Sequence, residues 1–182
     1  MLVRGIMLGL AAIVLWGAPA RAQIAIYGQA TGASLQFPNT SHLYGGTFGF
    51  YDTKRTGPIT IGGDFRGGLL KRGSSVGSFN DQAMDLGQLG VRVAVAPGVL
   101  PLLHSLMPYA EALGGIGYWR GGVGVTRQDA THSLVQLIAG ADYAIVPHIH
   151  WRVVEFSYGR AGADPGRINP EMLSTGIVLQ LP

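Results

Sequence analysis

Apolar and polar positions alternate along most of the chain after residue 22. The clearest case is Ser133–Ile145, in which every second residue from Val135 to Ile145 is apolar. Val146-Pro147-His148 follows, and then a second alternating segment, Ile149–Arg160. A period of two with one apolar face predicts β-strands, and the short connection predicts a hairpin.

The same pattern predicts eight strands. Each segment has 10 to 14 residues, enough to cross a bilayer at a tilt. In the mature chain only Val99–Met107 fits a short helix, within a connection. The predicted strands are Gln23–Leu35, Leu43–Asp52, Pro58–Leu70, Met84–Val95, Met107–Arg120, Ser133–Ile145, Ile149–Arg160 and Met172–Leu181.

The connections between the predicted strands alternate between short turns and longer polar loops. The longer ones are Gln36–His42, Lys71–Ala83, Gly121–His132 and Ala161–Glu171. This alternation is typical of a transmembrane barrel with short turns on its periplasmic side. The connection Ala96–Leu106 does not fit, because it is long and apolar.

The first 22 residues have the features of a secretory signal peptide. Arg4 precedes an apolar run, and Ala20-Arg21-Ala22 is a small-residue cleavage site. We therefore expect cleavage near Ala22/Gln23, a signal peptide over 1–22 and one barrel domain over 23–182. An even number of strands closes with every edge paired, so the predicted fold is all-β, an eight-stranded antiparallel up-and-down transmembrane β-barrel.

Composition supports a chain whose outside faces lipid. Glycine accounts for 29 of 182 residues, and charged residues for 13%, about half the usual ~25% of soluble domains. Without Arg4 and Arg21 the chain has 11 basic and 10 acidic residues, which gives no reason to expect a nucleic-acid partner. The absence of cysteine excludes both a disulfide scaffold and a lipoprotein.

If the apolar faces meet lipid, the opposite faces place a polar set in the lumen. In an eight-stranded barrel side chains fill the interior, and buried charges need partners. We expect an arginine–carboxylate network that fills the lumen, with a gate or narrow ion path as the alternative. Arg152 lies on the outward frame near a turn, where its side chain either reaches headgroups or is turned inward by a bulge. The predicted luminal set is Asp64, Arg66, Gln88, Arg92, Glu111, Gln136, Asp142 and Glu155.

Tyrosine and tryptophan gather near the ends of the predicted strands. Both favour the headgroup level of a bilayer, where an apolar ring keeps its polar atom hydrated. The predicted aromatic girdle comprises Tyr27, Tyr51, Tyr109, Tyr143 and Trp151 at the periplasmic end, and Tyr44, Tyr118, Trp119 and Tyr158 at the other end.

Three segments carry a resemblance to a known family. GADYAIVPHIHWRVVEFSYG, PYAEALGGIGY and the terminal MLSTGIVLQLP resemble strands of small eight-stranded outer-membrane barrels of the OmpA-like and OmpX-like type. The resemblance covers roughly Pro108–Leu181 and implies a porin-type barrel in the bacterial outer membrane. Such proteins usually end in an aromatic residue, which the barrel assembly machinery reads, whereas this chain ends in Leu181-Pro182.

The sequence offers no catalytic or metal-binding set, and we expect no enzyme activity and no cofactor. His148 and His150 share a face but have no acid or cysteine beside them. The leading hypothesis is a monomeric barrel with a structural or surface-interaction role. Its partners are outer-membrane lipid and the assembly machinery, with any loop-bound partner unknown. The alternatives are a narrow channel for ions or small solutes and a soluble exported barrel that binds an apolar ligand.

Overall fold

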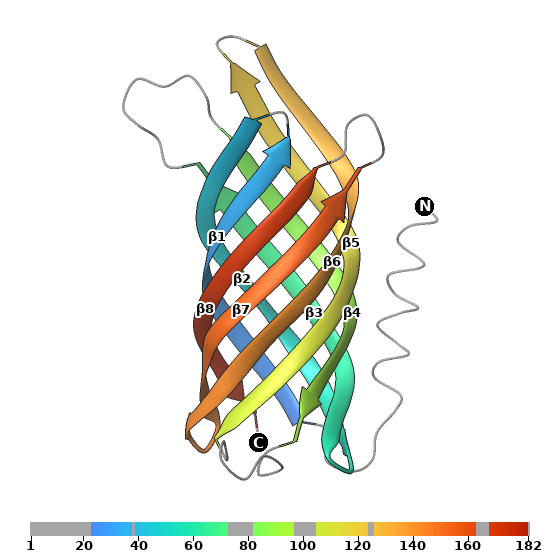
Figure 1. Cartoon of the computed structure of the whole chain (residues 1–182), viewed down its shortest axis with the longest axis vertical. Coiled ribbons are helices and arrows are strands. Elements are labelled where there is room, and N and C mark those ends of the chain that lie inside the picture. The colour runs from blue at the N-terminus through green and yellow to red at the C-terminus, as the bar shows by residue number, and fades with distance from the viewer. Residues whose placement is uncertain are drawn as a thin grey trace.

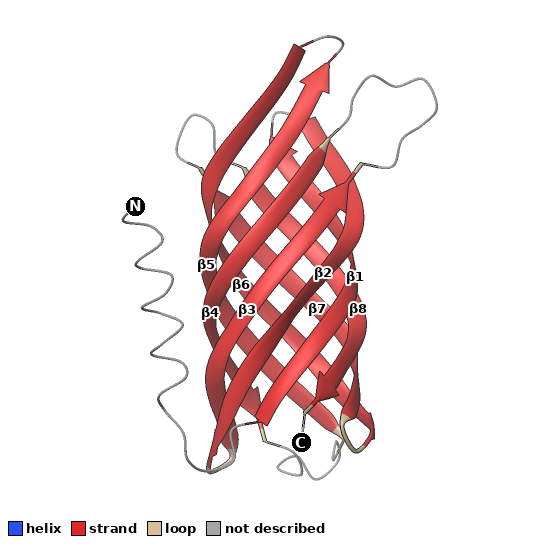
Figure 2. Cartoon of the chain, turned by 180° about the vertical axis from the view of Figure 1, so that it is seen from behind, coloured by secondary structure: helices blue, strands red, loops and turns tan. Residues whose placement is uncertain are grey.

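The protein folds into one closed barrel of eight antiparallel strands, each paired with its neighbours along the chain (Figures 1 and 2). This computed structural model describes residues 23–37, 39–72, 82–96, 105–123, 126–162 and 168–181. The strands are β1 Gln23–Phe37, β2 Asn39–Thr56, β3 Ile59–Lys71, β4 Ala83–Val95, β5 Leu106–Val123, β6 Thr126–Val146, β7 Ile149–Ala161 and β8 Asn169–Gln180.

The predicted number, order and kind of strands are confirmed. β8 closes the barrel against β1 in a ladder from Ala25 opposite Gln180 to Gln36 opposite Asn169. The ladder continues past the end of β8, where the Leu181 amide donates to the Ile24 carbonyl at 2.8 Å. Closure leaves no strand edge in lipid, so backbone groups of the spanning region are satisfied within the sheet.

Two tight turns connect strands at the end of the barrel where β1 begins and β8 ends (Figure 1). Gly57 occupies the turn between β2 and β3 with φ of 63°, and His148 occupies the turn between β6 and β7 with φ of 74°. The left-handed conformation suits glycine but is uncommon for a residue with a Cβ. We refer to this end as the turn end and to the opposite end as the loop end.

The predictions of polar loops at Gln36–His42 and Gly121–His132 are wrong, because strand pairing continues through both segments. β1 and β2 stay paired as far as Phe37 opposite Asn39, and β5 and β6 as far as Val123 opposite Thr126. A backbone ladder needs no apolar side chains once it has left the membrane, so the alternation that marked the strands ends before the strands do. The β5–β6 hairpin consequently projects beyond the other strands at the loop end (Figure 1).

The helix predicted for Val99–Met107 lies mostly outside the described residues. Residues 99–104 are not described, and Leu106 and Met107 begin β5. Most of the predicted loop Lys71–Ala83 is also outside them. Within the described ranges, no helix has the length and apolarity to cross a membrane.

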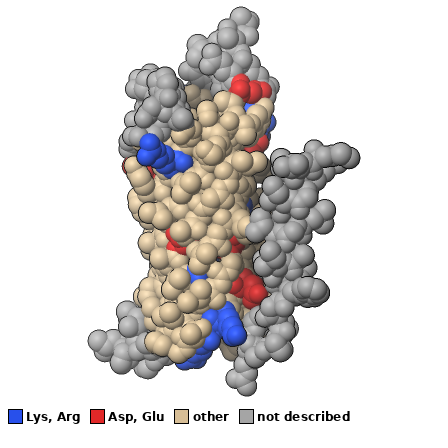
Figure 3. Space-filling model, turned by 90° about the vertical axis from the view of Figure 1, so that its right-hand side faces the viewer, with Lys and Arg blue, Asp and Glu red and all other residues tan. Residues whose placement is uncertain are grey.

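The outer face of the barrel carries the apolar half of the alternation. Exposed side chains include Leu137 at 63%, Leu173 at 59% and Phe156 at 50%. The face in Figure 3 is mostly uncharged along the middle of the barrel, with lysine and arginine gathered toward its two ends. This distribution is the reverse of what a water-soluble barrel with an apolar interior requires, and it matches a lipid-facing surface.

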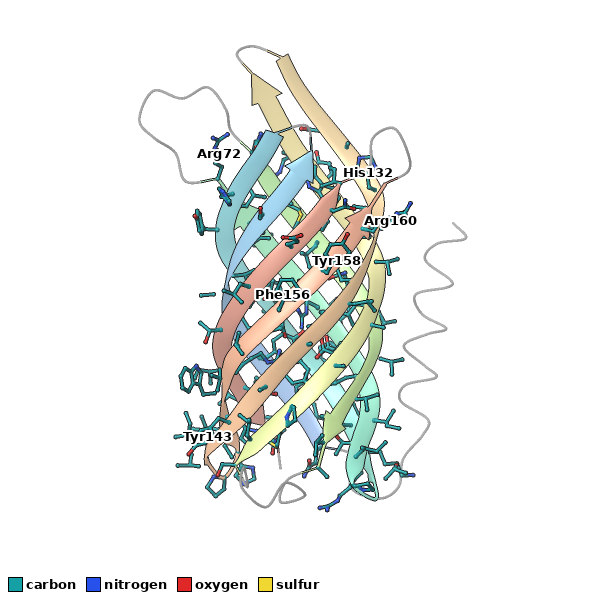
Figure 4. All side chains as sticks on the ribbon, viewed as in Figure 1. Arg72, His132, Tyr143, Phe156, Tyr158 and Arg160 are labelled. Carbon is teal, nitrogen blue, oxygen red and sulfur yellow. The ribbon has the colours of Figure 1, made fainter. Side chains whose placement is uncertain are left out.

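Replacing Phe156 with lysine is expected to destabilise the barrel in lipid. Phe156 points outward at about the middle of the barrel (Figure 4), where a lysine on the lipid face costs about 2–4 kcal/mol. Urea unfolding in phospholipid vesicles measures the effect, and Phe156→Leu is the control that keeps the site apolar. An unchanged free energy of unfolding for Phe156→Lys would mean that this face meets water.

Candidate functional site: the charged lumen

Three arginines and three carboxylates form a closed ring of ion pairs inside the barrel. Each arginine contacts two carboxylates, and each carboxylate contacts two arginines. Five of the six pairs have N–O distances between 2.6 and 3.1 Å, and no member is more than 4% exposed. The order around the ring is Arg66, Glu111, Arg92, Asp142, Arg152, Glu155 and back to Arg66.

The ring satisfies the physical requirement for burying charge. An unpaired buried ion costs several kcal/mol, so each charge needs an opposite partner and hydrogen bonds. The ring contains equal numbers of each sign, and five consecutive strands, β3 to β7, supply its members. The arginine–carboxylate network predicted from the sequence is therefore present, and all eight side chains of the predicted luminal set are buried.

A bulge in β7 brings Arg152 into the ring. Arg152 lies opposite Asp142 on β6, yet Val154 lies opposite Ala141, so Val153 is an extra residue. The ladder with β8 shifts at the same place, between Arg152 and Glu155. The extra residue changes which side chains point inward, so Arg152 and Glu155 both face the lumen although they are three positions apart in the sequence. Of the two orientations predicted for Arg152, the structure has the inward one, with the side chain fully buried.

Two tyrosines add hydrogen bonds to the charged groups of the ring, Tyr27 from β1 and Tyr109 from β5. The Tyr109 hydroxyl donates to Glu155 Oε2 at 2.6 Å. The Tyr27 hydroxyl donates to Asp64 Oδ1 at 2.9 Å and accepts from Arg66 Nε at 3.1 Å. Arg92 lies over the Tyr109 ring, with its guanidinium carbon 3.6 Å from the ring centroid. These contacts offset part of the desolvation of the guanidinium groups.

Glycines make room for the two tyrosine rings. A Cβ at Gly140 would lie 2.5 Å from the Tyr109 hydroxyl, and a Cβ at Gly49 would lie 2.6 Å from the Tyr27 hydroxyl. Since real Cβ atoms do not approach other atoms so closely, any larger residue at Gly140 or Gly49 would displace the side chain of Tyr109 or Tyr27. The two glycines thus allow the tyrosine hydroxyls to reach the charged groups of the ion-pair ring.

The prediction that Tyr27, Tyr51, Tyr109 and Trp119 belong to an aromatic girdle is wrong. Their side chains are only 5–8% exposed and lie inside the barrel. The prediction relied on closeness to strand ends and ignored which way alternate residues point. Tyr109 shares its parity in β5 with Glu111, which was predicted to face inward. The alternation by itself therefore predicts that Tyr109 also faces inward.

The other predicted girdle residues lie on the outer side. Tyr44, Tyr143, Trp151 and Tyr158 are 44–64% exposed, and Tyr118 is half-buried. Figure 4 shows Tyr143 at the turn end and Tyr158 nearer the loop end. Their contact with lipid headgroups stays a prediction.

An apolar cluster fills the lumen toward the loop end. Leu43, Leu70, Met84 and Leu134 are fully buried in it, and Trp119 packs in the same cluster. This cluster was not predicted, because polar residues alone were expected on the inner faces of the strands. The alternation could have revealed it, since Leu70 and Leu134 have the parity of the inward residues Arg66 and Gln136.

A layer of uncharged polar side chains lies in the lumen between the ring and the apolar cluster. Thr31 and Thr47 share a hydrogen bond of 3.0 Å, and Thr47 donates to Gln29 Oε1 at 2.8 Å. Gln136 Nε2 contacts Ser157 Oγ at 3.4 Å. Gln88 is 2% exposed, and its amide nitrogen and oxygen have no hydrogen-bond partner within the described part of the chain.

A cavity of about 160 Å³ opens at the turn end of the barrel. Gln23, Thr53 and Gln180 line it near the strand ends, and Arg92 and Asp142 line it deeper inside. His150 is another lining residue, 6% exposed, with Nδ1 3.3 Å from the Gln180 amide nitrogen. The cavity therefore extends from the turn end to the ring, and the apolar cluster fills the lumen on the loop side of the ring.

Catalytic and metal-binding residues were not expected, and that expectation stays a prediction. Across the described ranges, no group of three or more His, Cys, Asp or Glu side chains has the geometry of a metal site.

Comparisons with solved structures place this architecture among outer-membrane barrels. Neisserial surface protein A matches with a TM-score of 0.69 and 12% identity, over 87% of this chain and 97% of that one. Ail of Yersinia pestis matches with a TM-score of 0.58 and 12% identity, over 88% and 100%. The N-terminal barrel of Pseudomonas aeruginosa OprF matches with a TM-score of 0.52 and 16% identity, over 88% and 100%.

No protein-family model matches the chain, and no curated protein matches it. At 12–16% identity the structural matches establish the fold alone. The fold is that of a small eight-stranded outer-membrane β-barrel. In this chain the lumen contains a six-membered charged ring and an apolar cluster.

Proposed function

We propose that the mature chain, residues 23–182, is a monomeric outer-membrane protein with a structural or surface-interaction role. The observation that carries the proposal is the combination of an apolar outer face with a filled lumen. A barrel built this way is anchored by lipid, and its interior is used for its own stability. The proposal includes export by the 1–22 signal peptide and cleavage near Ala22/Gln23.

The outer face and the strand ends support lipid and the barrel assembly machinery as partners. The exposed apolar side chains form the surface that lipid covers, and the outward-pointing Tyr143 and Trp151 suit the headgroup level at the turn end. β8 pairs with β1 as far as Gln180, so the last strand takes part in closing the barrel.

The projecting β5–β6 hairpin supports contact with a partner outside the cell. It extends beyond the other strands at the loop end, which faces away from the periplasm in barrels with short periplasmic turns. Arg72, His132 and Arg160 lie toward the same end (Figure 4). The chemistry of any such partner is left open.

Membrane fractionation and gel migration test the location and the fold. We expect the protein in the outer-membrane fraction, with a mobility that changes on boiling in detergent because the folded barrel resists detergent. Mass spectrometry of the mature protein should give an N-terminus at Gln23. A soluble periplasmic protein whose mobility boiling leaves unchanged contradicts the proposal.

Conductance separates the proposed role from the alternative of a narrow channel. The ring and the apolar cluster fill successive levels of the lumen, so the purified barrel should give no current steps above background in a planar bilayer. A porin of known conductance, reconstituted in the same bilayer, is the positive control. Reproducible steps from the purified protein would favour the channel.

A further inference from the structure

Asp64 is a fourth luminal carboxylate that takes no part in the ring. It lies on β3, two residues before Arg66, and its side chain is fully buried. Tyr27 donates to its Oδ1 at 2.9 Å, whereas its Oδ2 has no hydrogen-bond partner among the described residues. Asp64 is therefore bound through one oxygen to a neutral hydroxyl, with no ion pair to the described part of the chain.

Charge balance distinguishes Asp64 from the ring members. The three guanidinium groups are already matched by Glu111, Asp142 and Glu155. An ionised Asp64 would leave the lumen with one surplus negative charge that water does not reach. A buried carboxyl group in that situation is neutralised by a proton more readily than it stays ionised.

The groups that face Asp64 do not supply a free positive charge. Tyr27 from β1 and Tyr51 from β2 are neutral phenols. Arg66 on the same strand and Arg92 from β4 each contact two ring carboxylates. Glu111 from β5 is negative and repels a second anion. The other ring members, Asp142, Arg152 and Glu155 from β6 and β7, bind one another and Arg66 or Arg92.

The neighbouring strand offers an acceptor for such a proton. Gly90 lies opposite Asp64 on β4, and Gln88 lies two residues away on the same inner face. Diagonal neighbours of this kind are about 7–8 Å apart at Cα, within reach of a long side chain. Neither Gln88 Oε1 nor Gln88 Nε2 has a hydrogen-bond partner among the described residues, and Gly90 places no side chain between Gln88 and Asp64. A neutral Asp64 keeps the hydrogen bond from Tyr27 at Oδ1, and Gln88 Oε1 is the candidate acceptor for a proton on Oδ2.

We propose that Asp64 is a buried proton-binding site, whose carboxyl group stays neutral in the folded barrel at neutral pH. On unfolding, the O–H bond at Oδ2 breaks, the proton goes to water, and the carboxylate is left hydrated. The proposal concerns the lumen and does not depend on the role proposed for the surface of the protein.

Infrared spectroscopy tests the proposal on the folded protein directly. The mature protein in detergent micelles at pH 7 should show the carbonyl stretch of a protonated carboxyl group, shifted by carbon-13 labelling of aspartate. The band should be absent from Asp64→Asn. It should be retained in Asp85→Asn, which removes a carboxylate that is about one-third exposed and paired with Arg120. Absence of the band from the unmodified protein would overturn the proposal.

Unfolding equilibria give a second test. A free aspartate releases its proton above about pH 4, so unfolding between pH 5 and 7 releases one proton from Asp64. Relative to Asp64→Asn, the unfolding equilibrium constant of the unmodified protein should rise tenfold per pH unit across that range. Parallel pH profiles for the two proteins would overturn the proposal. A difference that follows sodium or potassium concentration instead of pH would also overturn it and would assign a metal cation to the site.

Discussion

Replacing Arg152 with methionine is expected to lower the free energy of unfolding by about 3–5 kcal/mol, the cost of removing one partner from a buried ion pair. Arg152 is fully buried and bonds both Asp142, at 2.8 Å, and Glu155, at 3.1 Å. Methionine keeps most of the volume but leaves the ring with one surplus negative charge. Urea unfolding of the purified barrel in phospholipid vesicles measures the loss.

The matched control is Arg120→Met. Arg120 forms an ion pair with Asp85 at 2.6 Å, but both side chains are about one-third exposed, 33% and 31%. Ion pairs that water and salt reach contribute about 0–1 kcal/mol. The same substitution should therefore have a much smaller effect here, because the two pairs differ mainly in burial. Equal losses at the two positions would contradict the assignment of Arg152 to a fully buried position in the lumen.

A double variant tests whether charge balance is the cause. Asp142→Asn alone leaves the ring with a surplus positive charge, whereas Arg152→Met together with Asp142→Asn restores neutrality. The double variant should lose less stability than the sum of the single losses, by about 0.5–3 kcal/mol. Additive losses would mean that Arg152 contributes packing alone.

Replacing Leu70 with alanine is expected to lower the free energy of unfolding by about 2–5 kcal/mol. Leu70 is fully buried in the apolar cluster at the loop end of the lumen, beside Leu43, Met84 and Trp119. Truncation leaves a cavity among side chains from several strands, which the closed sheet prevents from collapsing. The same unfolding assay measures the effect.

Leu70→Met separates the cavity from other effects of substitution. Methionine conserves volume and apolarity, so the expected loss is under about 1.5 kcal/mol. If the alanine and methionine variants lose the same stability, packing inside the lumen is not what the cluster contributes. The comparison also tests the inward orientation of Leu70, because an outward leucine leaves no cavity within the protein.

Local pattern predicted the strands well, and predicted their ends poorly. The alternation of Leu89, Val91 and Val93 depends on lipid outside and polar groups inside, so it follows the part of each strand that lies within the membrane. At Gly121–His132 that constraint has ended while backbone pairing continues, and the strand persists without its pattern. The sequence pattern therefore located the membrane-spanning part of each strand more reliably than the two ends of the strand.

The tyrosines show where position along a strand is a weaker guide than parity. Tyr27 and Tyr109 lie near strand ends and have the amphipathic ring expected at a membrane interface. Each instead points inward, and its hydroxyl bonds a luminal carboxyl group. The apolar neighbours Ile24 and Ile26 already define the outward parity of β1, which excludes Tyr27 from the outer face.

By itself the sequence determined the class of fold, the number of strands and the inward placement of Asp64, Arg66, Arg92, Glu111, Asp142 and Glu155. Those features follow from a period of two and from the solvent that each face meets. Only the tertiary structure decided that the charges close into a ring, because their partners come from different strands and meet through barrel closure and stagger. It also decided the side of Arg152, since one extra residue at Val153 reverses the alternation and only the ladders with β6 and β8 show where that residue is accommodated.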